Sequence, residues 1–271
     1  MIYFPNAKIN LGLNIVSKRP DGYHNLETIF YPIAIKDGLE IIEKDGLRED
    51  VFVLHGIQIE GSQEDNLVMK ALRLMRKHYS FPFLEVHLLK KIPFGAGIGG
   101  GSADAAFMLR LLNDHYDLKA TTQELVEFAQ TLGADCPFFI HNKPMYAEGI
   151  GEKLEEVDLS LEKYHLVLVK PDIFISTKDA FSKIIPTQPR LNLREIAKLP
   201  IREWRGKMEN DFEKSISTLF PQIDKIKNEL YTLGAVYSSM SGSGSSVYGI
   251  FEELPTGLEQ KFSDCFVWKQ S

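Results

Sequence analysis

A glycine-rich loop between a strand and an apolar helix is the feature that most constrains how this chain folds. The segment LEVHLLKKI (84–92) has the short apolar pattern of a strand, and PFGAGIGGGSADAA (93–106) follows it with five glycines in seven positions. In the helix SADAAFMLRLLN that comes next, only Asp104 and Arg110 interrupt the apolar residues, which is typical of a buried helix. The segment therefore predicts a core helix that is entered through a loop whose backbone passes close to another group.

Phosphate is the group that such a loop most often approaches. Several glycines let backbone N–H groups converge on an anion, and the N-terminus of the following helix adds unpaired N–H groups and the positive end of its dipole. Ser102 can cap that helix or offer its hydroxyl to phosphate or Mg²⁺. Tight packing of the loop against the buried helix explains about two or three glycines. Five glycines therefore favour an anion site.

The loop also matches the G-x-G-x-x-G fingerprint of dinucleotide-binding proteins, through Gly95, Gly97 and Gly100. Asp117 follows at about the spacing of the acidic residue in that fingerprint. It falls, however, in a loop between two expected helices, and no strand follows the first of them. No Gly-Lys-Ser/Thr closes the loop, so it is not a Walker A motif either. The context therefore disfavours a dehydrogenase, and phosphate binding by the loop stays the prediction.

Composition and charge limit the class of protein. A chain of 271 residues with 44% hydrophobic and 25% charged residues is long enough for two ordinary globular domains. The formal net charge of −6 argues against a nucleic-acid partner. Cys136 and Cys265 have no ligand-like spacing, and no apolar run reaches the length of a membrane span. The start MIYFPNAKIN lacks a signal-peptide pattern. We expect a cytoplasmic protein without a membrane partner, as a monomer or a weak homodimer.

Strands and helices mingle along the chain without strict alternation, which favours the α+β class. The pattern changes between residues 155 and 160, so we expect an N-terminal domain over 1–157 and a C-terminal domain over 158–271. In NLVMKALRLMRKHY, Asn66 is a plausible helix cap, and Thr121 with Glu124 forms a capping box for TTQELVEFAQTLG.

Three motifs resemble those of one enzyme family. PFGAGIGGGSADAA is similar to the central motif of the GHMP small-molecule kinases, which include galactose, homoserine, mevalonate and phosphomevalonate kinases. PNAKINLGLNIVSKRPDGYHNLETIF and SGSGSSVYGIF resemble the motifs at its two ends, so that the resemblance spans residues 5 to 251. RPDGYHNLET, GADCPFF (133–139) and MENDFE (208–213) further resemble a branch that phosphorylates a small-molecule cytidyl diphosphate substrate in isoprenoid precursor synthesis by the non-mevalonate pathway.

This resemblance implies a two-domain GHMP kinase architecture that uses ATP and Mg²⁺. The N-terminal, ATP-binding domain would be like the second domain of ribosomal protein S5, and the C-terminal domain would be ferredoxin-like, with the active site in the cleft between them. Within the family an aspartate and a lysine flank the attacking hydroxyl, and the matching residues are Asp135 and Lys8. Without the resemblance, the residues favour other roles: Asp135 as the cap of a helix that begins CPFF, and Lys8 as a solvated lysine on a strand.

The resemblance also assigns binding residues. Tyr23 and Phe181 would hold a cytosine ring between two aromatic faces, and His24 would read its polar edge, although Phe181 could equally be a core residue. The ATP-binding residues would be Pro93, Phe94, Gly95, Ala96, Gly97, Ile98, Gly99, Gly100, Gly101, Ser102, Ala103 and Asn66, with Ser102 as a candidate ligand of Mg²⁺. The remaining substrate-binding residues would be Asn10, Thr177, Ser241, Gly242, Ser243 and Gly244.

Small departures from the family pattern leave the reacting groups in place. Asp104 stands where asparagine is common and would add a negative charge near the triphosphate, while Ala96 replaces a typical glycine and Ser243 a frequent threonine. A homoserine- or mevalonate-type kinase is the nearest alternative, and it is disfavoured by Tyr23 with His24 and by the aromatic Phe181. The other alternative is a non-catalytic nucleotide-binding sensor on the same fold, which has no reason to keep both Lys8 and Asp135.

Overall fold

The computed structural model describes residues 1–59, 62–189 and 191–270 of the chain. These residues form two compact units, and each unit takes in several segments of the sequence. The first unit consists of Met1–Lys8, Pro32–Phe94 and Gly99–Lys143. The second consists of Ile9–Tyr31, Gly95–Ile98 and Pro144–Ser271. The predicted division of the sequence into domains 1–157 and 158–271 stays a prediction.

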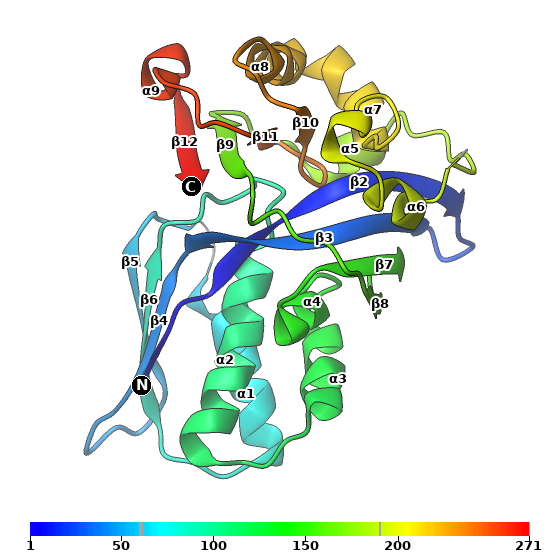
Figure 1. Cartoon of the computed structure of the whole chain (residues 1–271). Coiled ribbons are helices and arrows are strands. Elements are labelled where there is room, and N and C mark those ends of the chain that lie inside the picture. The colour runs from blue at the N-terminus through cyan, green and yellow to red at the C-terminus, as the bar shows by residue number, and fades with distance from the viewer. Residues whose placement is uncertain (60–61, 190, 271) are drawn as a thin grey trace. The chain divides into compact units, whose positions relative to one another are not determined.

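The first unit is a four-stranded mixed sheet with helices packed beside it (Figure 1). Its strands follow the order β1 (Ile2–Tyr3), β4 (Gly38–Glu43), β6 (Leu84–Lys90) and β5 (Val51–Gly56). Only β5 and β6 are parallel. The helices are η1 (Gln63–Asp65), α1 (Leu67–His78), α2 (Gly100–Tyr116), α3 (Thr122–Leu132) and α4 (Cys136–His141). Helix α2 contacts α1, α3 and α4 as well as β1 and β4, which makes it the centre of this unit.

The starts of these helices test the sequence predictions. Asn66 caps α1 by accepting the N–H of Val68 at 2.9 Å, and the capping box between Thr121 and Glu124 is formed. Helix α2 is buried along most of its length, as expected. It begins at Gly100, after Gly99 with φ 73°, and has no side-chain cap. The expectation that Ser102 caps it is therefore wrong, because this serine lies inside the first turn.

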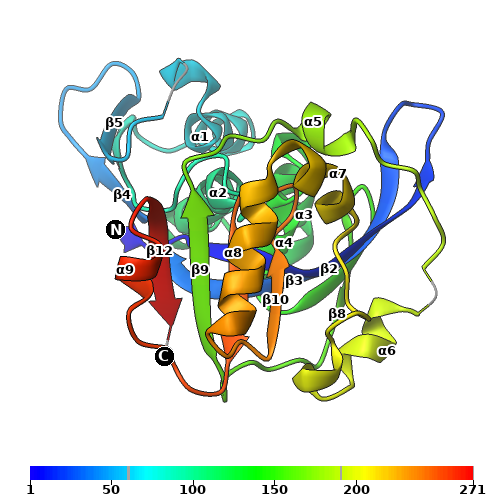
Figure 2. The same cartoon turned by 90° about the horizontal axis from the view of Figure 1, so that it is seen from above.

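The second unit contains an antiparallel sheet in the order β10 (Tyr237–Met240), β11 (Val247–Phe251), β9 (His165–Pro171) and β12 (Cys265–Gln270). Helix α8 (Pro221–Thr232) lies on it, in contact with β9, β10 and β11 (Figure 2), and packs against α7 (Asp211–Leu219). Helix α9 (Leu258–Lys261) joins β11 to β12. Along the chain, β9 is followed by helices, then by β10 and β11, then by α9 and β12, and β9 is an inner strand of the sheet. This is the β-α-β-β-α-β arrangement of ferredoxin-like domains. The expected ferredoxin-like sheet is thus confirmed.

A further sheet has the order β2 (Asn6–Lys18), β3 (His24–Lys36), β7 (Met145–Gly149) and β8 (Lys153–Glu156), and most of its residues belong to the second unit. The remaining elements of that unit are α5 (Thr177–Phe181), α6 (Leu193–Ala197) and η2 (Ile201–Glu203). The α+β class is therefore confirmed. Within the described ranges, none of the helices combines the length and the apolar character needed to cross a bilayer.

Candidate active site

Lys8 and Asp135 form an ion pair within the first unit. The Nζ of Lys8 lies 3.2 Å from Oδ2 of Asp135. The lysine side chain is 4% exposed, so Lys8 is not the solvated lysine that its place on a strand suggested. Asp135 occupies the N-cap position of α4, with proline in the first turn, yet its side chain makes no capping hydrogen bond. The carboxylate faces Lys8 instead and keeps 34% of its surface exposed, so that it can contact a ligand.

The end of the glycine loop lies against this pair. A Cβ added to Gly99 would stand 2.9 Å from Cζ of Phe139 and 3.3 Å from Cε of Lys8. A side chain here would clash with Phe139 and crowd the lysine stem, and the φ of 73° is one that glycine adopts without strain. The first turn of α2, which follows Gly99, therefore begins beside the Lys8 side chain.

Packing accounts for more of the loop glycines than the two or three that we expected. At four of the five positions, an added Cβ would lie closer than 3.0 Å to a neighbouring atom, which real Cβ atoms essentially never show. The contacts are Gly95 with Phe174, Gly97 with the carbonyl oxygen of Ser241, Gly99 with Phe139, and Gly100 with Ile92. Gly101 meets only Leu67, at 3.8 Å. The number of glycines is therefore no argument for phosphate, and the anion-binding argument depends on the first turn of α2, whose N–H groups have no side-chain cap.

The carboxylate of Asp104 lies in the core. Its side chain is 3% exposed, and Oδ2 accepts a hydrogen bond from Nζ of Lys90 at 2.7 Å. Burial raises the pKa of this carboxyl to about 8, although the Lys90 ammonium opposes the shift. The expectation that Asp104 presents a negative charge to a triphosphate is wrong, because the side chain points into the unit and pairs with a lysine there.

In the second unit, Ser241 joins the last motif to the middle of the glycine loop. Its hydroxyl donates to the carbonyl of Gly97 at 2.9 Å and accepts the N–H of Asn10 at 3.2 Å. Its side chain is fully buried, whereas Ser243 is half-buried. The glycine–serine turn therefore supports the loop. Binding of substrate by Ser241, Gly242, Ser243 and Gly244 stays a prediction.

Asn210 is a positioning residue that the sequence reading missed. Its Nδ2 donates to the carbonyls of Met240 and Gly242 at 2.8 and 2.9 Å, and its Oδ1 caps α7 at the N–H of Phe212. Glu213, one turn further on, accepts the N–H of Met240 at 2.7 Å. Both residues lie in MENDFE, so the resemblance of that motif was the signal, although it gave neither residue a role.

Asn10 is buried among hydrogen-bonding groups of the second unit. Its Nδ2 donates to Oγ1 of Thr28 at 2.9 Å, and its carbonyl accepts the hydroxyl of Tyr248 at 2.9 Å. Because the side chain is only 2% exposed, its first function is to order β2 and β3. Binding of substrate by Asn10 stays a prediction. Thr177 begins α5, but its side chain lies outside what the structure describes.

The aromatic residues expected to bind a base come together in part. His24 stacks on Phe181 with ring centroids 4.7 Å apart and an interplanar angle of 19°. Phe181 meets Phe212 edge-on at 4.8 Å, so it is also the core residue that its helix position allowed. Tyr23 is 62% exposed. Burial lowers the pKa of His24, which keeps the ring neutral at pH 7 with one donor and one acceptor nitrogen.

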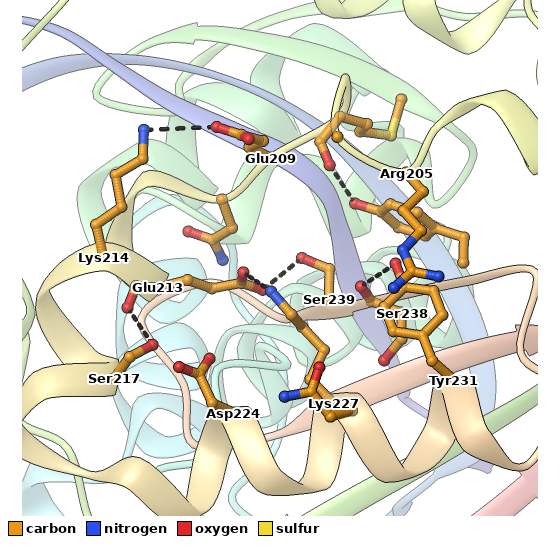
Figure 3. A pocket seen from close by; sticks show the side chains of 15 residues that line it. Arg205, Glu209, Glu213, Lys214, Ser217, Asp224, Lys227, Tyr231, Ser238 and Ser239 are labelled. Carbon is orange, nitrogen blue, oxygen red and sulfur yellow. Dashed lines mark hydrogen bonds and ion pairs between the residues drawn. The ribbon is translucent and has the colours of Figure 1, made fainter.

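The described residues contain no group of three or more His, Cys, Asp or Glu side chains arranged to hold a metal. A pocket of about 430 Å³ opens among α7, α8 and β10, and none of the predicted site residues lines it (Figure 3). Its charged side chains largely pair with one another, as Glu213 does with Lys227 at 2.5 Å.

Comparisons with known proteins show the class to which the chain belongs. The chain matches the GHMP kinases N terminal domain over residues 66–143 and the GHMP kinases C terminal over residues 193–264. A crystal structure of mevalonate kinase has a TM-score of 0.71 at 12% identity and covers 99% of this chain and 98% of that one, a likeness of fold alone. Fold and site thus define a small-molecule kinase of the GHMP class.

Relatives with higher sequence identity indicate one enzyme within this class. The 4-diphosphocytidyl-2-C-methyl-D-erythritol kinase of Parabacteroides distasonis is 56% identical, with 99% of this chain and 98% of the relative covered. The kinase of the same name from Cytophaga hutchinsonii is 42% identical, with 97% of each chain covered. A crystal structure of 4-(cytidine 5'-diphospho)-2C-methyl-D-erythritol kinase superposes with a TM-score of 0.80 at 29% identity, covering 99% and 98% of the two chains. The chain belongs to this family of GHMP kinases.

Proposed function

We propose that the protein transfers the γ-phosphoryl group of ATP to the 2-hydroxyl of 4-diphosphocytidyl-2-C-methyl-D-erythritol, giving the 2-phosphate and ADP. This reaction serves isoprenoid precursor synthesis by the non-mevalonate pathway, and we place it in the cytoplasm. The observation that carries the proposal is the ion pair of Lys8 and Asp135 at 3.2 Å, in a chain that is 56% identical to a relative of that name.

Asp135 and Lys8 would act on the reacting groups. The Lys8 ammonium fixes the orientation of the Asp135 carboxylate, whose exposed part would accept a hydrogen bond from the substrate hydroxyl. As the oxygen bonds to the γ-phosphorus and the bond to ADP breaks, the hydroxyl proton passes to Asp135. The positive charge of Lys8 would stabilise the negative charge that the transferring phosphoryl carries.

The glycine loop, residues 93–103, and the first turn of α2 would bind the phosphates of ATP through backbone N–H groups. Asn66 would contribute to the adenine site beside its role as a cap. Mg²⁺ is bound in kinases mainly through phosphates and water with one or two protein oxygens, and the half-buried hydroxyl of Ser102 suits such a site. When bound, the ion would neutralise phosphate charge.

Tyr23, His24 and Phe181 would bind the cytosine ring. Rings stacked at 4.7 Å leave no space for a base between His24 and Phe181, so the base would use the exposed face of Tyr23 and the outward edges of the other two rings. A neutral His24 offers both a donor and an acceptor to the polar edge of cytosine. Asn10 and Thr177 would bind the polyol part of the substrate, its 2-C-methyl-D-erythritol group.

Release of ADP with the cytidyl substrate, homoserine and mevalonate in parallel tests this proposal. We expect turnover with the cytidyl substrate alone. Turnover only with homoserine or mevalonate would assign the chain to another kinase of the class. ATP binding without turnover of any of the three would make it a nucleotide sensor.

A further inference from the structure

A buried lysine between two buried aspartates lies at the base of the glycine loop. Lys90, the last residue of β6, is 3% exposed. Its Nζ pairs with Oδ2 of Asp37 and, at 2.7 Å, with Oδ2 of Asp104. The side chains of Asp37 and Asp104 are 0% and 3% exposed. All three residues belong to the first unit, and none of them is one of the reacting groups proposed above.

Asp37 holds the strand end that enters the loop. Its Oδ1 accepts the backbone N–H groups of Lys91 and Ile92, at 2.5 and 2.8 Å. Its own N–H donates to the carbonyl of Pro5 at 2.8 Å, which anchors it to the N-terminal segment. One carboxylate oxygen of Asp37 therefore holds the backbone just before Pro93, while the other oxygen pairs with the Lys90 ammonium.

Asp104 holds the helix that leaves the loop. It is the fifth residue of α2, one turn beyond Gly100. The Gly100 backbone packs on Ile92 and on Lys90 itself, since an added Cβ would lie 2.8 Å from Cγ2 of Ile92 and 3.3 Å from Nζ of Lys90. The lysine thus ties the end of β6 to the first turns of α2, and the intervening loop is fastened at both ends.

We propose that Lys90, with Asp37 and Asp104, positions the first turn of α2 so that its N–H groups are oriented toward the phosphates of a bound nucleotide. Lys90 does not touch the nucleotide in this proposal; it acts through the loop ends that it joins. The inference deepens the proposed function and rests on it, because it assumes that this loop is where ATP binds.

The charges of this cluster indicate that its role is to position the loop ends and not to stabilise the fold. Two carboxylates and one ammonium in a buried site leave a net negative charge, and such clusters stabilise a fold less than apolar side chains of the same volume do. Burial raises the pKa of Asp104, so its carboxyl tends to take up the proton that removes this charge. Its Oδ1 is buried without a hydrogen-bond partner among the described residues. An asparagine here keeps the acceptor for Lys90, whereas an alanine loses it.

Titration of ATP into Asp104→Ala, Asp104→Asn and the wild-type protein, followed by calorimetry, tests the proposal. Asp104→Ala leaves Lys90 paired with Asp37, so its cluster is neutral and it is expected to fold. We expect ATP to bind at least about fivefold more weakly to Asp104→Ala, and within about twofold of wild type to Asp104→Asn. In turnover, the KM for ATP rises in Asp104→Ala while the KM for the cytidyl substrate stays unchanged. Lys91→Met, which removes an exposed charge from the adjacent position, is the matched control and binds ATP normally.

Thermal unfolding of each variant separates positioning from a purely structural role. Wild-type ATP affinity in folded Asp104→Ala, whatever its unfolding temperature, overturns the proposal. Equal weakening in Asp104→Asn or in Lys91→Met also overturns it, because the effect then follows charge and not the contact with Lys90. The titration measures ATP binding and needs no turnover. If the protein binds ATP but does not phosphorylate the cytidyl substrate, the proposed function is refuted, while the variants still test whether Lys90 positions the ATP-binding turn.

Discussion

The Nζ of Lys8 lies 3.2 Å from Oδ2 of Asp135, with the lysine buried and the aspartate one-third exposed. This asymmetry is what a reacting carboxylate needs: one side is held by a fixed charge and the other can reach a ligand. A buried ammonium also depends on its partner, because an unpaired charge in the interior is costly.

Replacement of Asp135 by asparagine is expected to lower kcat by about 10² to 10⁴, the usual contribution of a positioned acid–base group. The amide keeps the shape but cannot accept the proton. Steady-state assays of ADP release measure the loss, and Asp264→Asn, at an exposed position, provides the control. Near-normal turnover in Asp135→Asn would refute its role as the base.

Replacement of Gly97 by alanine is expected to destabilise the protein by at least about 2 kcal/mol. Its φ is 71°, and an added Cβ would stand 2.2 Å from the carbonyl oxygen of Ser241. Gly101→Ala is the matched variant, since Gly101 is helical and its added Cβ meets only Leu67; we expect it to be neutral or stabilising by up to about 1 kcal/mol. Urea unfolding compares the two, and similar effects would show that the Gly97 contact is relieved by movement of the loop.

Replacement of Asn210 by alanine is expected to cost about 2 to 4 kcal/mol, because it removes a helix cap and leaves the carbonyls of Met240 and Gly242 without their donor. Asn192→Ala removes only a cap, on α6, and is expected to cost about 1 kcal/mol. Equal losses of unfolding free energy in the two variants would mean that Asn210 does no more than cap α7.

The free energy of unfolding should depend on pH through Asp104. Its pKa in the folded protein is raised from 3.8 to about 8, so between these values the folded protein holds a proton that the unfolded chain releases. Stability from this group is therefore complete below pH 4 and is lost as the pH rises from there to about 8, at a limiting slope of about 1.4 kcal/mol per pH unit. The slope vanishes at higher pH, where both states have released the proton. Asp104→Asn lacks this loss, so its stability relative to wild type should increase from pH 5 to pH 8. Urea unfolding at several pH values measures the difference, and a constant difference contradicts the assignment.

Local features were predictable from the sequence because their causes lie within a few residues. The cap at Asn66, the capping box at Thr121 and the apolar character of α2 follow from spacing alone. The family resemblance added Lys8 and Asp135, which no local pattern selects. Ser102 was misjudged because the helix starts two residues earlier, at a glycine in the left-handed conformation.

The sequence by itself determined the α+β class, the strand, loop and helix around the glycine-rich segment, and the GHMP motifs, because periodicity, caps and motifs are contained in short stretches. Only the tertiary structure decided which side chains meet. It placed Asp104 against Lys90 in the core and packed four loop glycines closely against neighbouring atoms. It also placed the Asn210 amide where it donates a hydrogen bond to the glycine–serine turn. These contacts depend on how the segments pack in three dimensions and on which polar groups lose water when they do, and the local pattern around one partner does not identify the other.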